Sequence, residues 1–422
     1  MTPTPVAGVG YWYDSASRQW VAPGRPSLSG VLDIPREQLV YGTYIPGTLR
    51  DAALGIVGVN TSSVGCTSPD GDLEPVTGTD GVFTVDASTP AELFEGRHFQ
   101  SAVAIAAGLN GPRTFRNCRF SGNNPMISFA RWAADGSLPV GFGSAFRNWT
   151  SRHITLVDCT FDAGWWFDQG LSDYEAWQHS AAILGGHVTV ERSILEGFTD
   201  GVNFTGAPGN ADGRQFVKIL ASRLGPNYYA YGLPTSFAPQ AGQYTHSDGF
   251  QWNTGAKVEI AYSYIGGPRR YGARPVWPGG TQMGDAANAG LMIQQEPDSR
   301  YDEAQRRVDD IWVHDNWIAG GSSSVNLNFS QGNALPAPGL VEGYAGTRVV
   351  DNRIMSRIPG FNDSGYQIRY RTEMRSDVSR NVEWDPFGSL RGTGAPVLVH
   401  EVANSGSGDS VVRTWFSPMT GA

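Results

Sequence analysis

Short apolar stretches recur along this chain, and each contains one small residue that is polar or carries sulfur. In every copy an apolar residue lies two positions after this central residue. The central residues are Cys118, Cys159, Ser193, Ser222, Ser263, Asn316 and Asn352. Repetition of this kind predicts a solenoid, in which each repeat stacks only on its neighbours.

A second repeated segment alternates with the first. Residues 200–206 (DGVNFTG) are similar to residues 248–255 (DGFQWNTG). Weaker copies are centred on Met292, Asn326 and Gln367. Each copy has the length of a β-strand, since strands in globular proteins usually contain about 3–10 residues.

The spacing of the two segments defines a cycle. The shortest step from the first to the second is 10 residues, from Ser193 to Asn203, and the shortest return is 12 residues, from Gln251 to Ser263. The minimal cycle is therefore 22 residues with two apolar stretches of strand length. Helical patterns are absent between the strands, which argues against alternating βαβ units. Strands that repeat without hairpin turns predict an all-β parallel β-helix.

Residues 80–385 resemble the single-stranded, right-handed parallel β-helices of the pectate-lyase and tailspike type. The resemblance covers roughly three quarters of the chain and implies the fold more strongly than the function. Residues 1–79 show no repeat and are predicted to form an N-terminal attachment or capping region. Residues 386–422 are predicted to form a C-terminal cap or assembly segment, because a solenoid needs its end strands protected from edge pairing.

The charge and hydropathy of the chain exclude two classes of partner. The formal net charge is −9, which argues against nucleic acid and against anionic lipid. No run of 18 apolar residues occurs, so we expect no membrane insertion. The first residues lack the basic and apolar segments of a signal peptide, which favours a virion protein over a secreted enzyme.

Two of the three cysteines occupy the same position in successive copies of the first segment. Cys118 and Cys159 should therefore lie in neighbouring turns, about 4.8 Å apart in the direction of strand pairing. We expect two buried thiols within a stacked row. Cys66 has no evident partner in the sequence.

Three long insertions interrupt the cycle at the same point. They follow Cys159, Ser222 and Ser263, and the sequence predicts that they leave the solenoid at one corner and stack along one edge. All three are rich in aromatic residues. Their candidate ligand-binding and acidic residues are Trp165, Trp166, Asp173, Glu175, Trp177, Tyr231, Arg269, Arg270 and Trp277.

Aromatic rings beside carboxylates, amides and arginines are typical of glycan sites. Sugar faces stack on aromatic rings, while sugar hydroxyl groups need polar partners. Gln251, which follows the second insertion, is a further candidate ligand-binding residue. The alternative is that these aromatic side chains only pack the insertions onto the solenoid.

The sharpest local motif is residues 244–252 (YTHSDGFQW), where the second insertion re-enters the regular repeat. It resembles a His-x-Asp-Gly-x-Gln segment of the β-helical minor tail proteins of actinobacterial phages. Phe250 and Trp252 should face the core, so His246 and Asp248 are exposed only if the backbone bends before Gly249. The alternative is a buried Asp248 that binds turn amides, with His246 as its partner.

Asp200 occupies the position equivalent to Asp248, so the two carboxylates should lie close together if their turns are adjacent. Paired carboxylates serve glycoside hydrolysis, and Asp173 and Glu175 are alternative acids. A lyase needs instead a base that removes a proton from the sugar ring and a cation that stabilises the carboxylate of a uronic acid. Arg269 and Arg270, or a bound Ca²⁺, could supply the positive charge. We predict no resident metal or cofactor, with Ca²⁺ as the alternative.

Polar side chains also recur in the second segment. We expect Asn203, Gln251, Asn326 and Gln367 to stack as an outward-facing row of amides. Such a row is either structural or part of a binding surface.

The sequence favours a phage tail protein, a tailspike or receptor-binding component that binds host surface polysaccharide; whether it also depolymerises the polysaccharide stays open at this point. The resemblance implies a homotrimer attached to other tail proteins in the virion. The first alternative is a secreted, extracellular polysaccharide lyase or glycoside hydrolase of the pectate-lyase type. The second alternative is a structural spike segment without a ligand.

Overall fold

The computed structural model describes most of the repeated region and parts of the termini. The described residues are 4–5, 12–14, 19–21, 65–106, 108–122, 143–148, 150–162, 180–198, 200–204, 215–225, 229–231, 248–252, 256–266, 282–284, 289–295, 311–319, 323–329, 347–355, 366–371, 376–384, 396–404 and 409–416.

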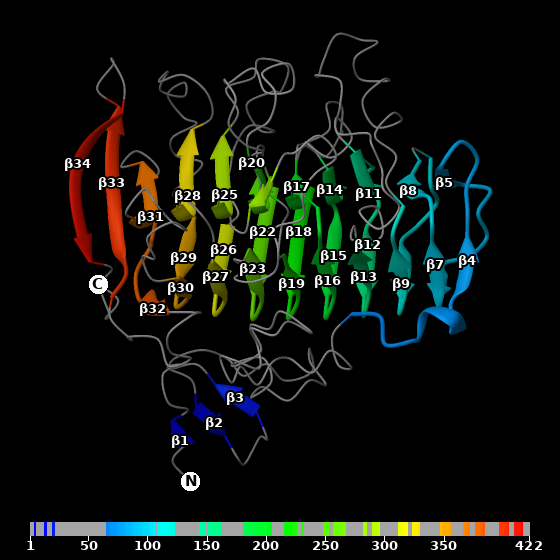
Figure 1. Cartoon of the computed structure of the whole chain (residues 1–422), viewed down its shortest axis with the longest axis horizontal. Helices are drawn as coiled ribbons and strands as arrows, with labels where there is room; N and C mark the ends of the chain where they lie inside the picture. Colours follow the sequence, from blue (N-terminus) through cyan, green and yellow to red (C-terminus); the bar gives the residue numbers. More distant parts are fainter. Residues whose placement is uncertain are drawn as a thin grey trace.

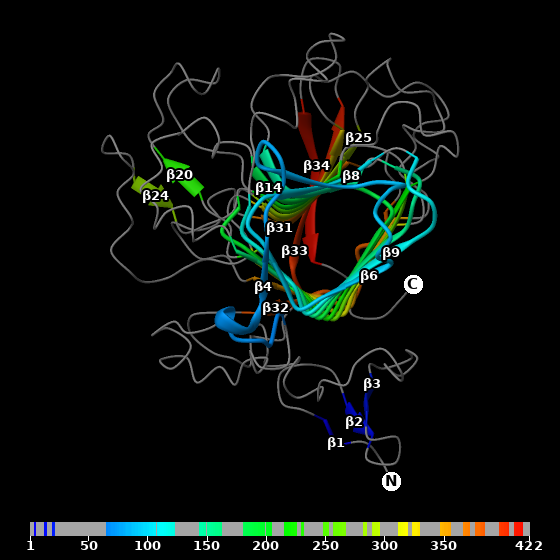
Figure 2. The same ribbon diagram turned by 90° about the vertical axis from the view of Figure 1, so that its right-hand side faces the viewer.

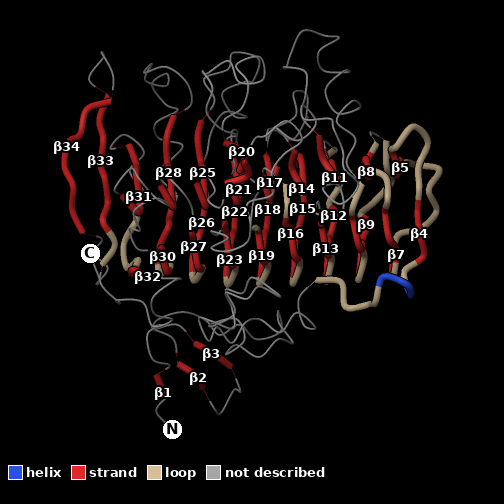
Figure 3. Tube along the Cα trace, viewed as in Figure 1, coloured by secondary structure: helices blue, strands red, loops and turns tan. Residues whose placement is uncertain are grey.

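Nearly every described element is a β-strand, and most strands belong to three large sheets (Figure 3). Sheet I contains β4 (Glu74–Val76), β7 (Arg97–Phe99), β10 (Arg119–Phe120), β13 (Thr160–Asp162), β16 (Ile194–Glu196), β19 (Arg223–Leu224), β23 (Tyr264–Gly266), β27 (Trp317–Ala319), β30 (Arg353–Met355) and β32 (Val382–Trp384). Sheet II contains β5 (Val82–Val85), β8 (Ala102–Ile105), β11 (Gly143–Asn148), β14 (Ser180–Gly185), β17 (Asp200–Phe204), β21 (Asp248–Trp252), β25 (Ala289–Gln295), β28 (Ser323–Phe329), β31 (Tyr366–Arg371), β33 (Leu398–Asn404) and β34 (Asp409–Phe416). Sheet III contains β6 (Leu93–Glu95), β9 (Arg113–Arg116), β12 (Ile154–Val157), β15 (Val188–Glu191), β18 (Gln215–Leu220), β22 (Ala256–Ala261), β26 (Ile311–His314) and β29 (Arg348–Val350).

From β4 to β31 the chain visits sheets I, II and III in a fixed cyclic order. Each strand pairs in parallel with its counterpart one turn later, for example β12 with β15 and β17 with β21. The strands lie side by side along the long axis of the molecule, and the three sheets surround a common interior (Figures 1 and 2). Three parallel sheets of this kind are consistent with a parallel β-helix, so the prediction of an all-β parallel solenoid is confirmed at this level.

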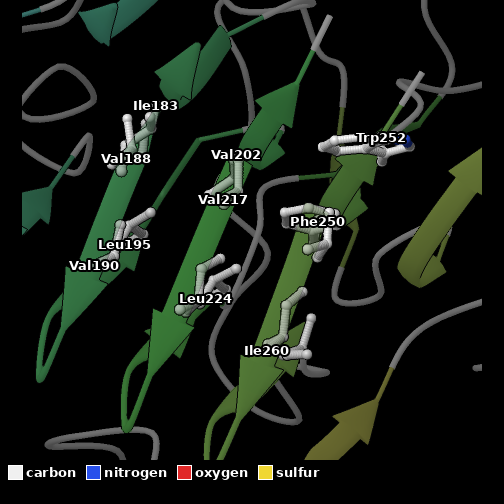
Figure 4. Close-up of a cluster of buried hydrophobic side chains, with 14 of the residues drawn as sticks. Ile183, Val188, Val190, Leu195, Val202, Val217, Leu224, Phe250, Trp252 and Ile260 are labelled. Carbon is white, nitrogen blue, oxygen red and sulfur yellow. The ribbon is translucent and has the colours of Figure 1, made fainter. Parts of the chain in front are cut away.

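Apolar side chains from all three sheets fill the interior (Figure 4). Equivalent residues of neighbouring turns stack on one another. The ring of Phe120 lies parallel to that of Phe161, with centroids 4.3 Å apart, and close to parallel with that of Phe99, at 5.0 Å. This stacking follows from the parallel register, which places each inward residue directly over its copy.

The corner between sheets III and I has the same backbone conformation in every turn. The residue after β6 is Gly96, with a φ of 64°; from β9 onward the residue at this corner has a positive φ between 45° and 59°, and none of these later residues is glycine. They are Asn117, Asp158, Arg192, Ala221, Tyr262, Asp315, Asp351 and, in the last turn, Arg380. Side chains with a Cβ adopt this left-handed region rarely, so the following residue must stabilise the corner.

That following residue is the repeated polar residue of the sequence, and its side chain links successive turns. The backbone N–H of Cys159 donates to the side-chain oxygen of Ser193, its counterpart in the next turn. The same contact repeats in five further turns, and in the last of them the Asn352 N–H donates to Asn381. The donor–acceptor distances are 2.9–3.1 Å. We call this series the corner ladder. It comprises Cys118, Cys159, Ser193, Ser222, Ser263, Asn316, Asn352 and Asn381.

Cys118 and Cys159 begin the corner ladder as free, fully buried thiols. The Cys118 thiol donates to the Arg116 carbonyl at 3.2 Å, and the Cys159 thiol donates to the Val157 carbonyl at 3.4 Å. Burial raises the pKa of Cys159 well above its usual value, which keeps the thiol protonated. The expectation of two stacked, buried thiols is therefore confirmed.

Strand pairing extends beyond residues 80–385 at both ends. β4 precedes residue 80 and pairs with β7, while β33 continues sheet II and turns back into the antiparallel β34. The remaining described elements are β1 (Thr4–Pro5), β2 (Trp12–Asp14) and β3 (Gln19–Val21), the 3₁₀ helix η2 (Asp70–Asp72), β20 (Tyr229–Tyr231) and β24 (Gln282–Gly284). The attachment and capping roles of the two terminal regions stay predictions. Within the described part of the chain, no helix has the length and apolar character needed to cross a membrane.

Candidate functional site

The three long insertions connect sheet I to sheet II. They join β13 to β14, β19 to β21 and β23 to β25. The second insertion contains β20 and the third contains β24, and these strands form an antiparallel pair in which Tyr231 is opposite Gln282. Figure 2 shows this pair outside the three sheets. Insertions from neighbouring turns therefore contact each other through this strand pair.

Most of the candidate residues in these insertions lie outside the described residues. Tyr231 is in β20, but only its backbone is described. The candidates outside the description are Trp165, Trp166, Asp173, Glu175, Trp177, His246, Arg269, Arg270 and Trp277. Their proposed roles stay predictions.

The structure brings Asp200 and Asp248 together. β17 pairs with β21 in a register that places these two residues at the start of adjacent strands. The Asp248 N–H donates to Asp200 Oδ1 at 3.0 Å, and the Ala289 N–H donates to Asp248 Oδ1 at 2.9 Å. Both aspartates are buried, with exposed fractions of 2 % and 1 %. Each carboxylate thus holds the first amide of the next strand of sheet II.

Two amide side chains complete this cluster on the outer face of sheet II. Gln251 lies between Phe250 and Trp252, both fully buried in the core, so its side chain points outward. The Asn203 amide donates to Gln251 Oε1 at 3.1 Å and to Asp200 Oδ2 at 2.9 Å. Because the Asn203 amide binds both Gln251 and Asp200, the Asp200 carboxylate at the start of β17 lies within hydrogen-bond distance of this outer face. We call Asp200, Asn203, Asp248 and Gln251 the outer polar cluster.

The predicted row of four amides is wrong in one member. In the register of four successive strands of sheet II, the residues of this row are Asn203, Gln251, Met292 and Asn326. The residue after Asn326 in this row is Arg369, not Gln367. Ile368 takes the core position beside Val325, and this shifts Gln367 out of the row; its side chain binds Glu383 and the Leu398 N–H instead.

Burial raises the pKa of Asp200 from 3.8 to about 7. The hydrogen bonds from Asn203 and from the Asp248 N–H oppose this rise, because they stabilise the ionised carboxylate. A carboxyl group with a pKa near neutrality is able to serve as a general acid. Its two oxygens, however, already accept hydrogen bonds from Asp248 and Asn203.

The pairing of β17 with β21 also sets the spacing of the two carboxylates. They make equivalent contacts in adjacent strands, so they are related by about one strand spacing of 4.8 Å. Carboxylates at about 5–5.5 Å are typical of retaining glycosidases. The spacing therefore fits hydrolysis, whereas the amide contacts fit the structural alternative.

The stability of the protein is expected to fall as the pH rises from about 4 to about 7, because of Asp200. A raised pKa means that the folded chain binds this proton more tightly than the unfolded chain, so the stabilisation is complete below pH 4 and is lost as Asp200 ionises. The shift of about 3 pKa units corresponds to a loss of up to about 4 kcal/mol. Urea unfolding of the wild type and of Asp200→Asn, at pH 4 and pH 8, measures this contribution.

Asp200→Asn keeps an oxygen acceptor for the Asp248 N–H but cannot ionise. The free energy of unfolding of the wild type should therefore fall between pH 4 and pH 8 by more than that of Asp200→Asn does. Asp72→Asn, which removes a carboxylate from an exposed position, is the control and should follow the wild type. Parallel pH profiles for the wild type and Asp200→Asn would contradict the assignment.

A second row of side chains, missed at the sequence level, lies on the outer face of sheet III. Lys218, Glu259, Trp312 and Arg348 occupy four consecutive strands in register. Lys218 forms an ion pair with Glu259 at 2.9 Å, and the Arg348 guanidinium lies 4.9 Å from the Trp312 ring centroid. The sequence held a signal for this row: each member lies four residues before a member of the corner ladder.

His314 extends this row. Its ring stacks on Trp312 at 3.8 Å, and its Nδ1 lies 2.8 Å from Asp315 Oδ2. His314 and, to a smaller extent, Lys218 lower the pKa of Glu259 to about 2. This surface therefore carries a carboxylate that stays ionised at any physiological pH.

No group of three or more His, Cys, Asp or Glu side chains is placed to hold a metal ion among the described residues. Asp200 and Asp248 both bind backbone amides, so Ca²⁺ stays a prediction without support from the outer polar cluster. We compared the chain with protein-family models, with curated proteins and with solved structures, and none of these comparisons gives a match.

Proposed function

We propose that this chain is a glycan-binding protein built on a right-handed, single-stranded parallel β-helix of the pectate-lyase and tailspike type. In this proposal it is a receptor-binding or tailspike component of a phage tail, trimeric and attached to other tail proteins. Its ligand is a host surface polysaccharide. The observation that carries the proposal is the outer polar cluster, which lies at the strand ends where the aromatic-rich insertions rejoin sheet II.

Each part of this cluster matches a requirement of glycan recognition. Gln251 is half-buried on the outer face of sheet II, and an amide side chain carries the donor and acceptor groups that sugar hydroxyl groups need. The candidate aromatic residues of the insertions supply stacking surfaces, and Arg269 and Arg270 supply positive charge for acidic sugars. Asp200, with its raised pKa, is the best placed proton donor if the protein also cleaves its ligand.

Binding is expected for at least one polysaccharide in a panel of bacterial envelope polysaccharides, neutral and uronate-containing. His246→Ala and Gln251→Ala should each weaken that binding about tenfold or more, because each removes a polar partner of the sugar hydroxyl groups. Titration calorimetry measures the affinity. New reducing ends indicate hydrolysis, and unsaturated uronate indicates a lyase.

Trp312→Ala is the matched control, since it removes an aromatic side chain from the outer face of sheet III. It should leave the affinity unchanged. If Trp312→Ala weakens binding and His246→Ala does not, the binding site lies on sheet III and not at sheet II as proposed. If no polysaccharide of the panel binds, the glycan-binding proposal fails.

A second candidate function, a structural segment without a ligand, is favoured by one specific observation. Both oxygens of the Asp200 carboxylate already accept hydrogen bonds from the chain itself. For this candidate, Asp248→Ala should lower the stability of the protein, because the Ala289 N–H loses its acceptor, and neither the wild type nor the variant should bind polysaccharide.

A further inference from the structure

All three cysteines of the chain gather at one corner of the solenoid. Cys118 and Cys159 are neighbours in the corner ladder, and Cys66 approaches the same corner from the segment before β4. The Cys66 thiol donates to the carbonyl of Asn117, the residue directly before Cys118, at 3.5 Å. The fold therefore concentrates the thiol chemistry of the chain in one place.

Strand register places Cys118 and Cys159 directly opposite each other. β9 pairs in parallel with β12 before the corner, and β10 pairs in parallel with β13 after it. The Thr160 N–H donates to the Cys118 carbonyl at 2.9 Å, so the pairing continues through the corner. The two Cα atoms are thus about one strand spacing of 4.8 Å apart, and disulfides join Cα atoms that are about 4.4–6.8 Å apart.

The two sulfur atoms also interact with each other. The Cys159 thiol donates to the Cys118 sulfur, and this contact lowers the pKa of Cys118. Cys159 keeps its proton, because burial raises its pKa. Cys118 is therefore the better nucleophile of the two, since the thiolate is the reactive form of cysteine.

The corner ladder does not need sulfur at these positions. Ser193 and Ser222 follow in the next two turns, and their hydroxyl oxygens accept the N–H of the turn before at 3.0 Å and 3.1 Å. Cys159 accepts the Cys118 N–H through sulfur, which is a weaker acceptor than oxygen. Two adjacent cysteines add what serines lack, the capacity to form a covalent bond between turns.

The segment before β4 crosses this corner from outside. We call residues 65–72 the corner strap; Figure 3 shows it as the tan tube and short blue helix that run past the lower ends of the strands to β4. The Thr67 N–H donates to Asn117 Oδ1 at 2.8 Å, and the Gly65 N–H donates to the Arg192 carbonyl at 2.7 Å. Asn117 precedes Cys118, and Arg192 lies two turns further on, so the corner strap crosses the turns of both fully buried thiols.

We propose that Cys118 and Cys159 are a redox-sensitive pair, shielded by the corner strap, that closes a disulfide between two turns when a peroxide reaches it. The Cys118 sulfur attacks hydrogen peroxide, so that an S–O bond forms, the O–O bond breaks, and the leaving hydroxide takes the thiol proton as water. The Cys159 sulfur then attacks Cys118, so that the S–S bond forms and the S–O bond breaks. The second hydroxide leaves with the Cys159 proton. The two thiols lose two electrons in total, and the peroxide is reduced to two molecules of water.

Oxidation of the folded, full-length protein tests the pair. In Cys66→Ser only Cys118 and Cys159 remain, and hydrogen peroxide should link their two peptides within one chain, with the loss of two hydrogen atoms. Labelling with N-ethylmaleimide in denaturant, followed by mass spectrometry, should show about tenfold less label on both cysteines than before oxidation. Dithiothreitol should restore the label.

Cys66→Ser combined with Cys159→Ser is the matched control, because serine already occupies this ladder position at Ser193. It should fold as Cys66→Ser does, which circular dichroism verifies, and Cys118 should form no disulfide within the chain. The proposal is overturned if both thiols of Cys66→Ser keep their label after peroxide, or if Cys118 becomes a sulfinic acid without a link. A link from Cys66 to either thiol in the wild type would overturn it as well.

A substitution in the corner strap tests the shielding. A Cβ on Gly65 would lie 2.6 Å from Thr160 Oγ1 and 2.8 Å from Ile194 Cδ1, and the φ of Gly65 is +81°, so only glycine fits. Gly65→Val should displace the corner strap and form the link about threefold faster or more. Gly71→Val, where a Cβ would meet nothing within 4 Å, should leave the rate unchanged. Equal rates in the two variants would overturn the role of the corner strap.

Discussion

Replacing Asn352 by alanine is expected to lower the free energy of unfolding by about 3 kcal/mol. The side chain of Asn352 is fully buried in the corner ladder. Its Oδ1 accepts the Asn316 N–H at 3.0 Å, and its Nδ2 donates to the carbonyls of Val313 at 3.0 Å and Val350 at 2.9 Å. Alanine would leave these backbone groups buried without partners, and each such group costs about 1–3 kcal/mol.

The midpoint of urea unfolding, followed by circular dichroism, measures this effect. Arg116→Ala is the matched control: its side chain is half exposed and lies 3.8 Å from Glu95, so the change should stay within about 0.5 kcal/mol. An Asn352→Ala variant as stable as the wild type would mean that the corner ladder contributes nothing to stability.

Gly249→Ala is expected to destabilise the protein by a similar amount, about 3 kcal/mol, for a steric reason. A Cβ at this position would lie 2.6 Å from the Gly290 carbonyl oxygen and 2.7 Å from the Gly266 amide nitrogen. Both are backbone atoms of neighbouring strands, which cannot move without breaking the pairing of sheets I and II. Any shift of the backbone at Gly249 would also displace Asp248 and Gln251 of the outer polar cluster, because all three residues lie in β21.

Gly71→Ala is the control for Gly249→Ala, because a Cβ on Gly71 meets no atom within 4 Å. Thermal unfolding of both variants compares the two glycines directly. If the two variants have the same melting temperature, the close approach of neighbouring backbone at Gly249 is not part of the folded structure.

The sequence predicted the solenoid and its period because the corner ladder imposes a local requirement that repeats. A left-handed residue must be followed by a small side chain that accepts a hydrogen bond from the turn before it. Ser193 and Asn352 satisfy this requirement equally well, so the pattern survives their replacement by one another. The adjacency of Asp200 and Asp248 could be predicted from the same periodicity.

The features that depend on contacts distant in sequence could not be predicted. The predicted position of Gln367 is two residues out of register, because only the core contact of Ile368 sets the position of β31. The burial of Asp248, which is 1 % exposed, could not be predicted either, because the sequence does not show what packs against it. Cys66 appeared without a partner because its contact with Thr160 spans 94 residues.

The corner ladder changes its chemistry along the axis, and this has a thermal consequence. Sulfur, a weak hydrogen-bonding atom, occupies the first turns of the corner ladder, where the rings of Phe99, Phe120 and Phe161 stack on one another in the core. Amides occupy the last turns. Apolar contacts lose strength on cooling, whereas hydrogen bonds do not share this dependence. The two ends of the protein are therefore expected to respond to cold differently, with the N-terminal turns loosening first.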